Sequence, residues 1–179
     1  MRKIDERPAL KYVLMALLPL AVLLYTPIAN YAILCFGERI LLETLPVDPR
    51  DILRGDYVRL SYKIETIDDR FIPQTLLESK RPREESDVYV LLQPDAQGYA
   101  QVSGVVMERP PSNATYIRGK LRLGWGVQYE CRYNLGVYYV PEGTGLELER
   151  AVRDGDVLAD VRLLGGRGVI KRLEVLARE

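Results

Sequence analysis

The sequence predicts a mainly β protein, in which an N-terminal transmembrane helix is followed by an antiparallel β sandwich or small barrel with two short helices. Three observations support this fold class. The chain starts with one long uncharged apolar run, short alternating segments bounded by Gly, Pro and Asp follow it, and few later segments suit a helix. We therefore expect a tail over residues 1–11, a transmembrane helix over 12–37 and one β domain over 38–179.

The apolar run has the length of a membrane-spanning helix. No charged residue occurs from Tyr12 to Gly37, and about 20 apolar residues cross the hydrocarbon core. Pro19 and Pro27 lie inside the run, where membrane helices tolerate proline. A cleaved signal peptide is the alternative, but its apolar core is expected to be about 7–15 residues long. Basic residues precede the run and only Arg39 follows closely, so the positive-inside rule predicts a cytoplasmic N-terminus.

The first part of the domain mixes strands with short helical pieces. Residues 39–47 suit a strand that ends among prolines. Residues 48–53 suit a single helical turn, with an aspartate cap and a proline at the first position. Gly55 then turns the chain into a strand over 56–66. Residues 72–80 suit a short helix, with a proline near its start.

Hairpins dominate the rest of the domain. Their strands are predicted over 88–92, 99–106, 114–123, 127–133, 157–164 and 169–176. Glycine-containing turns join these strands in pairs at 95–98, 124–126 and 165–168. Residues 134–145 are rich in turn formers, and residues 146–152 suit a short helix. Seven or eight short strands are typical of a sandwich or a small barrel.

The most informative stretch is Gly55–Tyr62, where a Gly-Asp turn precedes an alternating strand. Its spacing Gly-Asp-Tyr-x-x-Leu-x-Tyr resembles the signature of the GDYXXLXY family of bacterial membrane-anchored proteins. The lead-in over 48–57 and the later segment over 138–143 resemble further features of such domains. The resemblance implies a membrane-anchored bacterial domain. With the orientation predicted from the flanking charges, we expect a single-pass protein of the bacterial inner membrane whose domain is periplasmic or otherwise extracytoplasmic, a thylakoid membrane being the alternative. The resemblance implies no reaction, cofactor or catalytic residue.

The motif has two interpretations. In the structural one, the motif residues form a turn and pack in the core; these residues are Gly55, Asp56, Tyr57, Leu60 and Tyr62. In the functional one, two segments distant in sequence meet as a recognition surface, since loops on a β scaffold often bind partners. The residues of that surface are Arg54, Asp56, Tyr57, Tyr138, Tyr139 and Glu142.

Composition limits the chemistry. The chain has 25 basic and 25 acidic residues, and zero net charge argues against nucleic acid as a partner. It has no histidine, so catalysis by a histidine of this chain is excluded. We expect no metal site and no cofactor. Cys35 lies in the apolar run and Cys131 in the domain, so we expect no bridge between them and a buried thiol at Cys131.

These observations favour a non-enzymatic binding, scaffolding or accessory protein. Its expected partners are membrane lipid and another membrane or extracytoplasmic protein. An accessory subunit of a larger photosynthetic or secretion complex is the first alternative. A membrane-bound Ser–Lys hydrolase is the second, because Ser61 and Lys63 would share one face of a strand.

Overall fold

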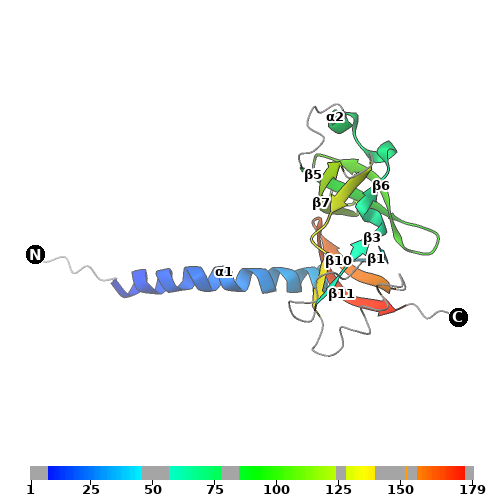
Figure 1. Cartoon of the computed structure of the whole chain (residues 1–179). Helices are drawn as coiled ribbons and strands as arrows, with labels where there is room; N and C mark the ends of the chain where they lie inside the picture. The colour runs from blue at the N-terminus through cyan, green and yellow to red at the C-terminus, as the bar shows by residue number, and fades with distance from the viewer. Residues whose placement is uncertain are drawn as a thin grey trace, which may run out of the picture.

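The computed structural model describes residues 8–45, 57–77, 85–123, 128–139, 152 and 157–175. Helix α1 (Pro8–Phe36) projects from one side of a β domain, and the domain broadens to both sides of the helix axis (Figure 1). Residues Met15–Phe36 of α1 are long and apolar enough to cross a membrane, and Ile33 alone among them is buried. The predicted helix is therefore present as one continuous element.

The domain is built from short strands. They are β1 (Glu38–Leu45), β2 (Tyr57–Arg59), β3 (Ser61–Tyr62), β4 (Thr66–Ile67), β5 (Ser86–Pro94), β6 (Ala100–Val106), β7 (Tyr116–Leu123), β8 (Tyr129–Arg132), β9 (Val137–Tyr139), β10 (Val157–Leu164) and β11 (Arg167–Val175). Three short helical pieces complete the described elements: η1 (Lys63–Glu65), η2 (Asp69–Phe71) and α2 (Gln74–Leu77).

The strands form three antiparallel sheets that curve into a nearly closed barrel. The first has the order β11-β10-β1-β3, the second pairs β2 with β9, and the third has the order β4-β8-β7-β5-β6. A bridge between Leu41 and Tyr99 connects β1 to the start of β6, and η1 carries the chain from β3 to β4. The first and third sheets thus meet on two sides, which confirms the predicted fold class.

The predicted strand over 56–66 is interrupted in the structure. It consists of β2, β3 and the helical turn η1, and the next short strand β4 already belongs to another sheet. The chain turns a corner at Leu60, between β2 and β3, which belong to different sheets. There the Leu60 amide donates to the Gly136 carbonyl at 3.0 Å, outside the described strands. The sequence pattern shows alternation through this corner but not the change of sheet.

Several other boundaries differ from the expected ones. Strand β9 lies within 134–145, where only turns are predicted, because Val137-Tyr-Tyr pairs with β2. Of the expected helix over 72–80, α2 covers four residues. The predicted turn over 48–53 and the glycine turn at 124–126 lie outside the described residues, as does all of the helix over 146–152 except Val152.

The core contains side chains from all three sheets. The largest fully buried ones include Leu42, Tyr62, Val90 and Ile117. Their burial follows the alternation of the strands, with one face of β1 and β5 turned inward. Because apolar burial contributes about 25 cal/mol per Å², this interior is the main stabilising term of the domain.

Candidate functional site at the helix–domain junction

Helix α1 meets the domain through one residue, Gly37, between Phe36 and β1. The Gly37 amide donates to the Ile33 carbonyl at 2.8 Å, and Arg162 Nη1 donates to the Gly37 carbonyl at 3.3 Å. Ile33 is buried, and α1 contacts β10 and β11. A Cβ atom at Gly37 would lie 2.4 Å from the Ile33 carbonyl oxygen, so a side chain does not fit. The helix end is thus held against the sheet without a linker.

Close to this junction, β2 and β9 form a two-stranded antiparallel pair, which we call the motif ribbon. Tyr57 is opposite Tyr139, and Val58 is opposite Tyr138. Tyr138 packs against the core, whereas Tyr139 is 79% exposed. The ribbon therefore brings one end of the motif beside the Tyr-Tyr pair. The other predicted recognition residues, Arg54, Asp56 and Glu142, lie outside the described residues, as does Gly55, so a joint recognition surface stays a prediction.

The inward half of the motif is part of the core. Val58, Leu60 and Tyr62 are all buried. The Tyr62 hydroxyl donates to the Leu135 carbonyl at 2.9 Å, two residues before β9. Burial raises the pKa of Tyr62 well above its ordinary value. Leu60 and Tyr62 are thus core residues, and both donate hydrogen bonds to the segment just before β9.

A groove of about 340 Å³ separates the motif ribbon from α1 and β11. Its lining residues are Asn30, Asn134, Leu135, Val137, Tyr138, Tyr139, Gly168, Val169 and Ile170. This mixture of a few polar groups with apolar side chains is typical of binding grooves. Sequence reasoning missed Val137 and β11 as lining elements, although the β-branched and aromatic run Val137-Tyr-Tyr is a strand signal.

A second hollow, of about 450 Å³, lies on another part of the junction. It is lined by Phe36 from the helix end, by Leu164 and Gly166 from the β10–β11 hairpin, and by Arg109 and Tyr116. The Arg109 Nε donates to the Tyr116 hydroxyl at 3.2 Å. Phe36 and Leu164 are exposed apolar side chains. The helix end is therefore flanked by two hollows that both contain exposed apolar groups.

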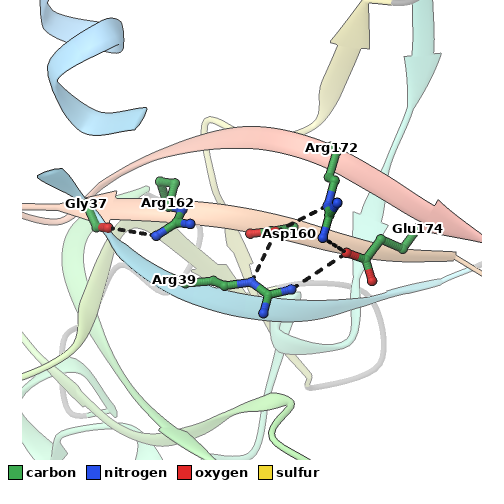
Figure 2. A network of polar contacts seen from close by, with 6 residues as sticks. All are labelled: Gly37, Arg39, Asp160, Arg162, Arg172 and Glu174. Carbon is green, nitrogen blue, oxygen red and sulfur yellow. Dashed lines mark hydrogen bonds and ion pairs between the residues drawn. The ribbon is translucent and has the colours of Figure 1, made fainter. Parts of the chain in front are cut away.

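A charge network joins the three strands that support the junction (Figure 2). Asp160 on β10 is 1% exposed, and its Oδ2 accepts from Arg39 Nε at 3.1 Å and lies 3.5 Å from Arg172 Nε. Glu174 Oε1 lies 2.6 Å from Arg172 Nη2 and 3.6 Å from Arg39 Nη2. Two guanidinium groups thus compensate the buried carboxylate. The network ties β1, β10 and β11 together beside the contact between Arg162 and Gly37.

Ser61 and Lys63 bind different carboxylates. Ser61 Oγ donates to Glu65 Oε2 at 2.5 Å, and Lys63 Nζ donates to Glu43 Oε1 at 2.6 Å. Lys63 lies in η1 instead of on the strand of Ser61, and its side chain is about half exposed. Burial is the main cause that raises the pKa of Glu65, and the Ser61 hydrogen bond opposes it. This arrangement lacks the buried Ser–Lys contact that the hydrolase alternative needs.

Cys131 is fully buried, which confirms the expected role as a core residue. Burial raises its pKa to about 12, so the thiol is protonated at neutral pH. Gly119 is required beside it, because a Cβ there would lie 2.3 Å from Cys131 Sγ. Cys35 is exposed on α1, and both cysteines are free.

The basic strand face of β7 is largely paired. Arg122 Nη2 lies 2.8 Å from Glu130 Oε2, Lys120 Nζ lies 3.7 Å from Glu85 Oε2, and Arg118 lies over the Tyr89 ring. Within the described part of the chain, no group of three or more Cys, Asp or Glu is arranged to hold a metal ion.

Comparison with known proteins gives one match. A family model described as "GDYXXLXY protein" matches residues 19–173, from within α1 to within β11. No curated protein and no solved structure matches the chain.

Proposed function

The chain belongs to the GDYXXLXY protein family, and from this premise we propose that it is a single-pass membrane protein whose extracytoplasmic β domain binds another membrane component. The exposure of α1 carries this proposal. A helix of 22 residues that is apolar on every side and buries only Ile33 suits a lipid environment. Basic residues before the helix support a cytoplasmic N-terminus under the positive-inside rule.

The motif ribbon is the binding surface in this proposal. It lies in its own two-stranded sheet, and Tyr139 on it is exposed beside a groove. Tyrosine is enriched at recognition surfaces because its ring buries apolar area while its hydroxyl forms hydrogen bonds. The groove also includes Asn30 of α1, so a partner in the groove would contact helix and domain together. This location favours a partner that is itself in or at the membrane.

The test is affinity purification of the tagged full-length chain from native membranes in mild detergent, with mass spectrometry of what is retained. Wild type is compared with Tyr139→Ala and with Val175→Ala as the matched control. Both side chains are exposed and apolar, but Val175 lies at the end of β11 and does not line the groove. We expect a partner that is retained by wild type and by the Val175 variant and lost from the Tyr139 variant.

Equal retention by all three proteins would remove the motif ribbon as the binding surface.

Intact mass measurement of the membrane-extracted chain tests the anchor separately. A mass that includes residues 1–37 is expected for an anchor, and loss of those residues would mean a cleaved signal peptide. The hydrolase alternative predicts an activity that Ser61→Ala abolishes, whereas our proposal expects that variant to behave as wild type.

A further inference from the structure

We propose that the face of the β domain around the helix end is a lipid-contact surface, seated in the interface of the phospholipid bilayer on both sides of α1. This proposal rests on the membrane anchor of the proposed function and adds a second membrane contact made by the domain itself. We call this face the membrane seat and define it by Phe36, Val137, Tyr139 and Leu164.

The absence of a linker brings the domain to the bilayer. A single residue, Gly37, separates the helix from β1, and its carbonyl is bound by Arg162. The domain broadens to both sides of the helix axis directly beyond the helix end (Figure 1). The face turned toward the helix is therefore the face turned toward the bilayer.

The groove lies at the depth where the hydrocarbon ends. Tyr12 and Tyr31 are both exposed on α1, and tyrosines concentrate at the two membrane interfaces. At a rise of 1.5 Å per residue they are about 29 Å apart, which is the thickness of the hydrocarbon core. Asn30 is next to Tyr31 and lines the groove with β9 and β11. Asn30 lies about 9 Å before Phe36 along the helix. Strands β9 and β11 therefore reach back alongside α1 from its C-terminal end, toward the bilayer and to headgroup depth.

Exposed apolar side chains concentrate at the same face. Beyond Tyr31, the large apolar side chains that the described residues expose are Phe36, Met107, Val137, Tyr139, Leu164 and Val175. Four of these six line the two hollows beside the helix end: Val137 and Tyr139 line the groove, and Phe36 and Leu164 line the second hollow. Apolar groups gathered in this way mark an interaction surface.

The polar groups of this face suit the headgroup region. Arg109 lines the second hollow, Arg162 binds the helix end, and Asn30 lies in the groove. Glu38 is the acidic residue of the second hollow, and Thr115 donates to it at 2.9 Å. Arginine, asparagine and tyrosine can donate hydrogen bonds to phosphate and ester oxygens while apolar neighbours insert. A phospholipid interface is therefore the occupant that matches both parts of the surface.

The test uses the full chain in vesicles of phosphatidylcholine mixed with phosphatidylglycerol, with one spin label at a time. Cys35→Ser is the background, and its lack of labelling must first show that buried Cys131 does not react. Labels at Val137→Cys and Leu164→Cys report the two sides of the seat. Leu23→Cys reports insertion of α1, and Val175→Cys is the matched exposed control away from the hollows. Circular dichroism checks that each variant is folded.

The readout is the collision rate of each label with lipid-soluble oxygen relative to a water-soluble nickel chelate. We expect this ratio at positions 137 and 164 to be several-fold higher than at position 175. Values equal to the control while the label at position 23 lies in lipid would overturn the seat and leave the anchor intact. A lipid-like value on one side alone would also overturn it, because the seat is two-sided. A water-exposed label at position 23 would overturn the anchor and the seat together.

Discussion

Helix α1 and the β domain contain the same types of apolar residue, which are exposed on the helix and buried in the domain. Leu18 and Leu23 of α1 are about 70% exposed, whereas Leu42 and Leu92 of the domain are almost completely buried. Burying one such side chain stabilises a protein by about 1.5–3 kcal/mol in water. A run of exposed leucines is compatible with an apolar surrounding such as a membrane. The comparison teaches that the domain buries its apolar side chains within the protein, whereas α1 leaves them exposed, as a membrane anchor would.

The largest loss of stability is expected when a buried side chain of the domain is removed. Tyr62→Ala removes a fully buried ring and the hydrogen bond to Leu135, so we expect a loss of about 3–5 kcal/mol in the free energy of unfolding. Tyr139→Ala, at an exposed tyrosine of the motif ribbon, should change this free energy by less than about 0.5 kcal/mol. Urea unfolding in detergent, followed by circular dichroism, measures both.

Tyr62→Phe separates the ring from its hydroxyl. It leaves the Leu135 carbonyl without its donor, and we expect a loss of about 1–3 kcal/mol. Equal stabilities for Tyr62→Ala and wild type would show that the ring is not part of the cooperative core.

A comparable change in α1 should affect insertion and leave the domain folded. Val22→Arg places a charge near the middle of the helix, at a cost of about 3 kcal/mol in translocon-insertion scales. We expect a clear decrease in the alkali-resistant membrane fraction, while Val22→Leu should remain inserted. Unchanged membrane retention of the arginine variant would contradict a lipid environment for this position.

The junction between the two regions should show an intermediate effect. In Gly37→Ala the new Cβ meets the Ile33 carbonyl oxygen, and the resulting shift should destabilise the contact by about 1–3 kcal/mol. Gly104→Ala is the matched control, because its Cβ would have an ordinary 3.5 Å contact with Leu91 Cδ1. Limited trypsin digestion of the folded protein at Arg39 measures the opening of the junction. Equal digestion of the two variants would mean that the close approach has no mechanical role.

The smallest effect is expected at Glu65, a partly exposed group at the domain corner. Burial raises the pKa of Glu65 above the ordinary value of 4.5. At a pH between the unfolded and folded pKa values, the folded state therefore holds a proton that the unfolded state has released. Stability therefore decreases as the pH rises from about the unfolded value through the higher folded one. Glu65→Gln should remove this decrease, with a gain below about 1 kcal/mol at neutral pH after solvent screening.

Unfolding of wild type and Glu65→Gln should be compared at pH 4 and pH 7. The two proteins are expected to approach each other at the lower pH, where the carboxyl group is mostly protonated in both states. A larger difference at pH 4 than at pH 7 would reverse the sign of the coupling.

The sequence by itself determined the elements whose pattern is local. The uncharged run over 12–37 predicts α1, and the glycine turns at 95–98 and 165–168 predict hairpins that the structure contains. The alternation in Gly55–Tyr62 groups Leu60 and Tyr62 on one side of the chain, and both are buried in the structure. Such features follow from periodicity and turn chemistry, which act over a few residues.

Only the tertiary structure decided what depends on distant pairing. Strand β9 exists because Val137–Tyr139 pairs with Tyr57–Arg59, and Val58 lies 80 positions before its partner Tyr138. The groove needs Asn30, β9 and β11 together, and Asp160 is buried because Arg39 and Arg172 approach it from neighbouring strands. A single sequence has no local signal for these long-range contacts. The free energy that selects them comes from side chains brought together when the sheets curve into the nearly closed barrel.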